Sequence, residues 1–221
     1  MASLRELLFR DIDGNGTTEP YAVIDAGVTD RRYLDRIPGL REVLADDAAE
    51  GYHRFLAVVA LASWGHAPVY PVVAAIAEAG RRSPWFGRVT DGRDRDYSFP
   101  TLAGAVAEGR ALTDDEPARL TAVRALTRRA DEVFFHWQLA YAADDPALTD
   151  AVAEVVDRGL ARDDEPDFDR SVQLADLCAV LARHDRPRAE ELAHRLLARD
   201  SRTVTRTHLC SVVPFREVTG A

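Results

Sequence analysis

The sequence predicts an all-helical protein, and three features support this prediction. Apolar residues recur at steps of three and four along most of the chain, as on one face of an α-helix. Proline and glycine interrupt these stretches at short intervals, as they do at helix ends. The longest apolar stretch, residues 55–77, has no charged side chain and is interrupted at Gly65 and Pro68. We therefore expect a stack of short helices, with residues 1–221 forming one domain.

Residues 50–80 are predicted to form a helical hairpin at the centre of the domain. Its first helix covers 52–64, and the second begins at Pro68 and stops at Gly80. A membrane span is the alternative, because the uncharged stretch is long enough for one. Pro71 and the many alanines favour two buried helices, so we expect no contact with a membrane.

Composition narrows the class of protein. The chain of 221 residues is 47% hydrophobic, has a formal net charge of -9, and carries arginine but no lysine. A negative charge disfavours unspecific binding to nucleic acid and makes a basic protein partner more suitable. Two separated cysteines, Cys178 and Cys210, and an N-terminus without a sustained apolar segment predict a cytoplasmic protein.

In the N-terminal half, three leucines mark the face of a first short helix: Leu4, Leu7 and Leu8. Residues 21–28 fit either a strand or a buried helix end, because the segment is too short for periodicity to decide. A helix capped by Thr29 or Asp30 is expected to reach about residue 44, with a kink or break at Pro38. Another short helix is expected over residues 101–112.

In the C-terminal half, the sequence DDEP at residues 114–117 predicts the start of the longest helix. Thr113 and Glu116 match a capping box, and the apolar stripe from Leu120 continues to Ala140. A shorter helix is expected to end near residue 160. The same tetrapeptide at 163–166 predicts a further helix start. The last two helices are expected to begin at Pro187 and after Ser201, and Pro214 is expected to end the second of them.

The loop at residues 11–16 contains three candidate metal ligands. Its sequence DIDGNG matches positions one, three, five and six of an EF-hand-like calcium loop, with these ligands: Asp11, Asp13 and Asn15. Position twelve is Ala22, where a bidentate glutamate is needed to complete the coordination shell. An Asx turn with glycine is therefore the favoured interpretation, and no metal or other cofactor is expected.

Residues 81–100 are predicted to form a long loop inserted between helices. Long loops in compact domains often bind partners, and this one combines aromatic and basic side chains. The candidate binding residues are Trp85, Phe86, Arg93, Arg95 and Tyr97. The alternative is that the aromatic rings only cover a hydrophobic end of the helical array. Trp137 is a further candidate outside this loop.

A weak repeat connects three helix junctions. In each, a helix rich in Ala and Leu ends in a turn, and a proline opens the next helix: Pro68, Pro146 and Pro187. These prolines are separated by 78 and 41 residues, which corresponds to units of about 40. At these residues the chain resembles a HEAT- or armadillo-like α-solenoid of antiparallel helix pairs. The resemblance implies a curved surface that holds other molecules. A non-repetitive helical bundle is the alternative architecture.

Acidic and aromatic residues concentrate at 131–137, including Asp131, Glu132, His136 and Trp137. An acid beside a stacking aromatic is the logic of HEAT-like alkylpurine DNA glycosylases, which this chain is similar to in length and helix count. The resemblance implies an enzyme in which Asp131, Glu132 and His136 are the catalytic candidates, and a small-molecule enzyme would use the same three. The acidic balance disfavours a duplex-binding groove.

The leading hypothesis is a protein-interaction module, either an adaptor or an immunity-type inhibitor whose acidic surface meets a basic partner. It depends on the predicted helix pairs, the acidic composition and the aromatic loop. Phosphate-binding, nucleophile-elbow and zinc motifs are absent from the sequence.

Overall fold

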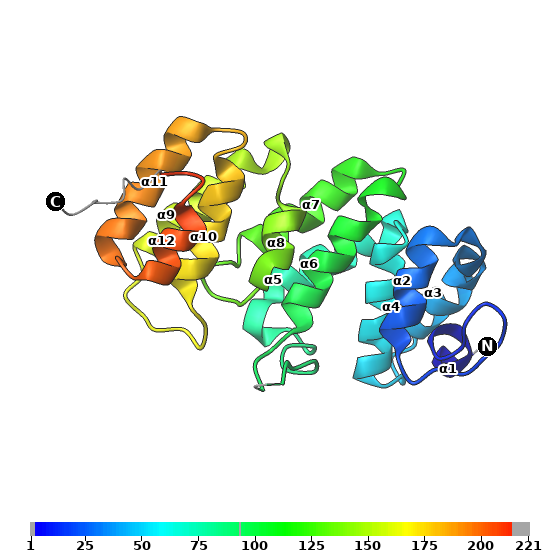
Figure 1. Ribbon diagram of the computed structural model, residues 1–221. Coiled ribbons are helices and arrows are strands. Elements are labelled where there is room, and N and C mark those ends of the chain that lie inside the picture. Colours follow the sequence, from blue (N-terminus) through cyan, green and yellow to red (C-terminus); the bar gives the residue numbers. More distant parts are fainter. Residues whose placement is uncertain (1–2, 93, 214–221) are drawn as a thin grey trace. The chain divides into compact units, whose positions relative to one another are not determined.

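The computed structural model describes residues 3–92 and 94–213 (Figure 1). Within these ranges the chain is all-α, which confirms the predicted fold class, and it has no strand beyond two isolated bridges. The chain divides into two compact units, Met1–Leu126 and Thr127–Ala221. Each unit has its own core, and each is described by itself.

The first unit begins with a short helix that carries the three predicted leucines. Its helices are α1 (Leu4–Leu8), α2 (Pro20–Thr29), α3 (Ile37–Ala45), α4 (Gly51–Ser63), α5 (Tyr70–Ala79), α6 (Ser98–Glu108) and α7 (Glu116–Thr127). The segment left open between strand and helix belongs to α2. The predicted break at Pro38 is confirmed, because the 3₁₀ segment η1 (Arg31–Arg36) gives way to α3 there.

Helices α4 and α5 form the hairpin predicted from the apolar stretch. Every side chain of α4 from Phe55 to Ser63 is buried. At the reversal Gly65 has φ 71°, and a Cβ there would lie 2.6 Å from the carbonyl carbon of Leu112. Glycine is needed at this turn for both reasons. Among the described residues, no helix combines the length and the apolar character that a membrane crossing requires.

Both consecutive and alternate helices contact one another within the first unit. Helix α4 packs against α3 as well as against α2 and α6, and α1 packs against α3 (Figure 1). The indole of Trp64, at the end of α4, donates a hydrogen bond of 2.8 Å to the buried carbonyl oxygen of Ile24 in α2. A Cβ on Gly27 would lie 2.3 Å from the indole nitrogen of Trp64, so the two helices meet at closest approach there.

Two loops of the first unit share the same hydrogen bonds between their first and fifth residues. In the first, Asp11 N–H donates to Asn15 O, Asn15 N–H donates to the Asp11 carboxylate, and Arg10 bridges to Gly16. In the second, Asp91 and Arg95 make the same two bonds, and Thr90 bridges to Asp96. The fourth residue has positive φ in both loops, 89° at Gly14 and 59° at Asp94. These loops lead into α2 and α6.

The second unit contains five helices: α8 (His136–Ala142), α9 (Thr149–Leu160), α10 (Arg170–Leu181), α11 (Arg186–Arg199) and α12 (Thr203–Leu209). Helix α10 contacts both α8 and α12, which lie two positions before and after it in the chain, and α9 contacts α11 (Figure 1). Proline stands in the first turn of three segments that follow a reversal, as predicted for Pro68, Pro146 and Pro187.

Three predicted helix boundaries are wrong. The single long helix expected from residue 116 to 140 is interrupted, because α7 ends at Thr127 and turns occupy residues 128–135 before α8. The second DDEP sequence, at 163–166, lies in a loop, and α10 begins only at Arg170 with Asp169 as its cap. Helix α12 begins after Arg202 rather than after Ser201. Pro214, the expected stop, lies outside the described residues.

Candidate functional site

Helix α8 of the second unit presents two large aromatic side chains to solvent. Trp137 is 56% exposed and Tyr141 is 62% exposed. Their positions differ by four residues, so they share one face of the helix, and their ring centroids are 6.3 Å apart. In the described chain, Val204 at 42% is the remaining large hydrophobic side chain that is clearly exposed. An exposed pair of large aromatic rings is typical of a recognition surface.

Further rings connect this pair to the loop at 161–169. Trp137 lies 6.4 Å from His136, and His136 lies 5.9 Å from Phe134, measured between ring centroids. Phe134 in turn lies 6.1 Å from Phe168. We call these five rings the aromatic run: Tyr141, Trp137, His136, Phe134 and Phe168. Its last member is only 7% exposed, so the run leads from solvent to a buried ring.

The buried amide of Gln173 positions the start of α8. Its Oε1 accepts a hydrogen bond of 2.7 Å from the Phe135 N–H, and its Nε2 donates to the carbonyl oxygens of Ala130 and Val133 at 2.6 and 2.9 Å. These three backbone groups lie outside regular helix, so they need partners. His136, which follows Phe135, has φ 51°, a value that is uncommon for residues other than glycine.

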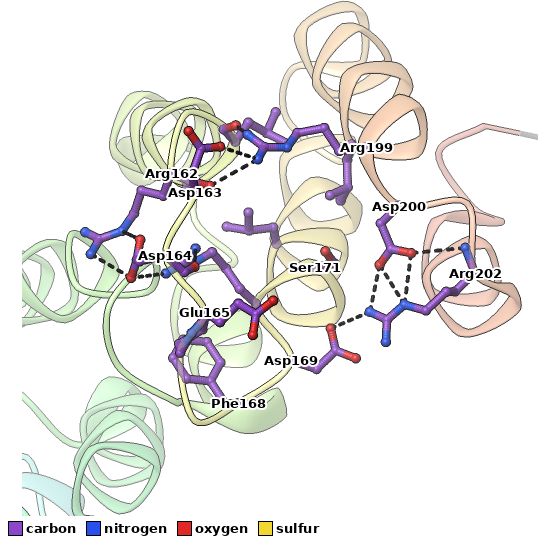
Figure 2. A pocket seen from close by; sticks show the side chains of 16 residues that line it. Arg162, Asp163, Asp164, Glu165, Phe168, Asp169, Ser171, Arg199, Asp200 and Arg202 are labelled. Carbon is purple, nitrogen blue, oxygen red and sulfur yellow. Dashed lines mark hydrogen bonds and ion pairs between the residues drawn. The ribbon is translucent and has the colours of Figure 1, made fainter.

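Beside Phe168 the second unit has an open cavity of about 570 Å³ (Figure 2). Its lining combines apolar residues with four arginines and five acids. The apolar part comprises Leu160, Leu174, Leu196 and Phe168, and the arginines are Arg162, Arg170, Arg199 and Arg202. The acids are Asp163, Asp164, Glu165, Asp169 and Asp200. The loop at 161–169 supplies four of these five acids, so it forms most of the charged wall.

Asp131 does not line the cavity and is fully buried. Arg158 binds it with two hydrogen bonds, Nε to Oδ2 at 2.9 Å and Nη2 to Oδ1 at 2.6 Å. Arg162 connects Asp131 to the loop, because its Nη1 lies 3.4 Å from Asp131 Oδ2 and 3.0 Å from Glu132 Oε1. Both oxygens of Asp131 are therefore occupied by arginine, and the carboxylate is not presented to solvent.

Two acids of the cavity are held tightly by arginine. Asp164 accepts hydrogen bonds from Arg162 at 2.8 and 3.1 Å and from Arg170 at 2.8 Å, and these bonds hold its pKa well below the ordinary range. Arg202 likewise lowers the pKa of Asp200, to which Thr205 also donates. These two carboxylates remain charged and paired at neutral pH.

The other three acids are more accessible. Asp163 pairs with Arg199 at 2.9 Å and Asp169 pairs with Arg202 at 2.8 Å, and the side chains of these pairs are 40–93% exposed. Glu165 is exposed and has no hydrogen bond or ion pair with another described residue. Figure 2 shows Glu165, Phe168 and Asp169 along one stretch of the loop. Asp169 also accepts a hydrogen bond from the Val172 N–H as the cap of α10. The cavity therefore offers one free carboxylate, Glu165, and one that is held by a single exposed ion pair, Asp163.

The sequence candidates in the loop at 81–97 belong to the first unit and are largely engaged there. Trp85 is buried, and its ring meets that of Phe55 at 6.0 Å. Phe86 packs 6.1 Å from Phe99, with the Arg81 guanidinium 5.3 Å from its ring. Arg95 pairs with Asp91 at 2.9 Å, and Tyr97 is half-buried as the cap of α6. Arg93 lies outside the described residues.

The three candidate calcium ligands form an Asx turn. Asp11 Oδ1 accepts hydrogen bonds from the N–H groups of Asp13 and Asn15, and its Oδ2 accepts one from Asn15 Nδ2 at 2.8 Å. These bonds hold the pKa of Asp11 below its ordinary value. Across the described residues, no three His, Cys, Asp or Glu side chains gather in a way that suits a metal ion.

The structure brings some candidates together and separates others. Asp131, Glu132, His136 and Trp137 lie in one region of the second unit, yet Asp131 is buried behind arginine while Trp137 faces solvent. Sequence reasoning missed Tyr141, Phe168 and Glu165. Tyr141 stands four residues after Trp137, so in a helix that extends past residue 141 the spacing places both on one face. No model of a protein family, no curated protein and no solved structure matches the chain.

Proposed function

We propose that this protein is a cytoplasmic helical-repeat module that binds another protein through the second unit. The observation that carries the proposal is the exposed pair Trp137 and Tyr141 on α8. Tryptophan and tyrosine are the side chains most enriched in the energetic centres of protein interfaces, where they bury large areas with little loss of conformational entropy. Exposed in a free protein, such a pair favours a partner that covers it.

For the architecture we propose a HEAT-like solenoid built from helix pairs. Support comes from the contacts of consecutive and alternate helices inside each unit and from the prolines that open the segment after three of the reversals. Repeat proteins of this type use extended surfaces to hold partners rather than deep catalytic pockets. A non-repetitive bundle remains the alternative architecture.

Within this class, we propose an adaptor or an immunity-type inhibitor with a basic partner. The loop at 163–169 has five acidic side chains among seven residues and no basic one. Opposite charge on a partner speeds the encounter and selects against acidic competitors. The enzymatic alternative gains no support from Asp131, whose oxygens are occupied by Arg158 and Arg162.

The proposal is tested by capturing the partner with matched variants. Tagged wild type, the double variant Trp137→Ser/Tyr141→Ser and the control Val204→Ser are incubated with extract of the native cell, and bound proteins are identified by mass spectrometry. All three substitutions replace exposed side chains, so we expect all variants to melt within a few degrees of wild type. We expect one protein to be retained by wild type and Val204→Ser and to be lost from the double variant.

Two outcomes contradict the proposal. One is that the double variant retains the same proteins as wild type. The other is that no protein is retained by any form while the purified chain turns over a small molecule. A loss of binding accompanied by a large fall in melting temperature is resolved with the single variants Trp137→Phe and Tyr141→Phe, which keep an aromatic ring in place.

A further inference from the structure

We infer that the partner binds the second unit through an arginine side chain, which enters the cavity beside Glu165 while neighbouring residues of the same segment cover Trp137 and Tyr141. This inference rests on the proposed function and adds the chemistry of the occupant. It is carried by three properties of the surface: charge, shape and the aromatic run that connects the cavity to α8.

The charge of the cavity favours a cation. Its five acids exceed its four arginines, and Glu165 has no partner among the described residues. The pairs of Asp163 with Arg199 and of Asp169 with Arg202 are exposed, and such pairs contribute only about 0–1 kcal/mol each. A guanidinium next to Glu165 would therefore find one open carboxylate, and the exposed ion pairs on the rim would oppose its entry only weakly. An anion would be repelled by the excess of acidic side chains.

The shape and lining favour arginine over lysine. The cavity has buried apolar residues, including Leu160, Leu174 and Phe168, beneath a charged rim. An arginine side chain has an apolar stem that covers such a floor and a planar head that binds carboxylates with two parallel hydrogen bonds. Lysine offers a single strongly hydrated charge, which loses more solvation on entry. The volume of about 570 Å³ is ample for one such side chain.

The aromatic run indicates where the residues that flank the arginine in the partner segment bind. Phe168 lines the cavity, and successive ring contacts of 5.9–6.4 Å lead from it through Phe134 and His136 to Trp137 and Tyr141. Apolar or basic side chains that flank the arginine would pack on the exposed rings of α8, where a cation over a ring face contributes further binding free energy. The occupant is thus a protein segment rather than an isolated amino acid.

The inference is tested with synthetic peptides and the full chain. Hexa-arginine, hexa-lysine and hexa-glutamate are titrated into the protein by calorimetry at about 0.15 M salt, where long-range attraction is largely screened. Binding is also followed by fluorescence, because Trp137 is the exposed tryptophan while Trp64 and Trp85 are buried. We expect hexa-arginine to bind most tightly, to protect Trp137 from acrylamide quenching, and hexa-glutamate not to bind.

A matched pair of variants locates the site. Glu165→Gln and Glu154→Gln each remove one exposed carboxylate that has no partner among the described residues, and only Glu165 lines the cavity. We expect Glu165→Gln to weaken hexa-arginine binding about tenfold, equivalent to about 1.4 kcal/mol. Glu154→Gln should change it less than about twofold, because Glu154 does not line the cavity.

Three outcomes overturn the inference. The first is no binding of hexa-arginine, and the second is equal weakening by Glu165→Gln and Glu154→Gln, which would indicate unspecific attraction. The third is concentration-dependent dimerisation of the chain that Trp137→Ser/Tyr141→Ser abolishes, since a second copy would then cover α8. If the first or second occurs while the double variant still loses a captured partner, the proposed function stands and only the arginine chemistry fails.

Discussion

Arg158 holds the fully buried carboxylate of Asp131 with two hydrogen bonds, of 2.9 and 2.6 Å, although 45% of the arginine side chain is itself exposed. Arg158 also donates to the carbonyl oxygen of Arg128. The pair therefore joins α9 to the turns at 128–135, the segment that precedes α8. A charge placed inside a protein depends on such a partner, because water cannot replace it there.

The first prediction concerns this pair. Arg158→Ala leaves the buried Asp131 with only the longer contact from Arg162, so we expect the second unit to lose about 3 kcal/mol of unfolding free energy. The measurement is urea denaturation followed by circular dichroism. The control is Arg188→Ala, whose partner Asp150 is 88% exposed. It should cost at most about 1 kcal/mol. Equal effects of the two substitutions would show that Asp131 does not need Arg158.

The second prediction concerns Gln173. Gln173→Leu fills a similar volume but leaves the Phe135 N–H and two carbonyl oxygens without their partner. We expect a loss of about 3 kcal/mol, because unsatisfied buried polar groups are costly. Hydrogen exchange of peptides covering 130–142 should become faster, while peptides from α4 should keep their protection. An unchanged exchange rate at the Phe135 amide would show that the side chain does not position α8.

The third prediction concerns the contact between α2 and α4. In Gly27→Ala the new Cβ would meet the indole of Trp64 at 2.3 Å and displace the nitrogen that donates to Ile24 O. Overpacking of this kind costs about 1–3 kcal/mol, and the lost hydrogen bond adds to it. The matched control is Gly51→Ala, where nothing lies within 4 Å of the new atom. Thermal unfolding should show a lower melting temperature for Gly27→Ala and an unchanged or higher one for Gly51→Ala. The reverse order would refute the contact.

The fourth prediction concerns acid. Hydrogen bonds from Arg202 and Thr205 lower the pKa of Asp200 in the folded chain, so the folded form binds fewer protons than the unfolded form near pH 4. The stabilisation is therefore complete above the unfolded pKa and is lost as the pH falls below it. We expect the melting temperature to drop from about pH 5 downward, and Asp200→Asn to reduce that drop while lowering stability at pH 7. An identical pH profile for the variant would contradict the assignment.

The hairpin of α4 and α5 could be predicted almost to the residue because its signals are local. Gly65 provides the positive φ of the turn, Pro68 opens the next segment, and Gly80 ends α5 with φ 55°. A run without charges between such residues leaves few alternatives to two buried helices. The expectation of an all-helical chain follows from the same kind of signal repeated along the sequence.

The break at 128–135 could not be predicted, because its cause lies far away in the sequence. The apolar stripe from Leu120 to Ala140 keeps helical spacing across the break, so periodicity predicts an uninterrupted helix there. The turns there are satisfied by Gln173 on α10, and by Arg158 on α9. Side chains some 30 to 40 residues away therefore decide where α7 ends and where Trp137 and Tyr141 point.

The two DDEP sequences also show that local sequence alone does not determine local structure. At 114–117, Asp115 accepts a hydrogen bond from the Ala118 N–H, and α7 starts as predicted, although Asp115 rather than Thr113 makes the bond to the helix backbone. At 163–166, Asp164 instead binds Arg162 and Arg170, and the segment stays a loop. An identical tetrapeptide thus takes two structures because its carboxylates have different partners. Only the DDEP sequence at 163–166 lines the candidate cavity, and the cavity could not be predicted from the local sequence.

The paired loops before α2 and α6 suggest a practical use for this scaffold. The loops DIDGNG and DGRDRD share the hydrogen bonds between their first and fifth residues, and both begin with an aspartate whose carboxylate binds the fifth residue. The second position is Ile12 in one loop and Gly92 in the other, so these hydrogen bonds tolerate replacement there. Foreign recognition peptides grafted at this position would be displayed on a fixed frame, provided that the leading aspartate and a residue able to adopt positive φ are retained.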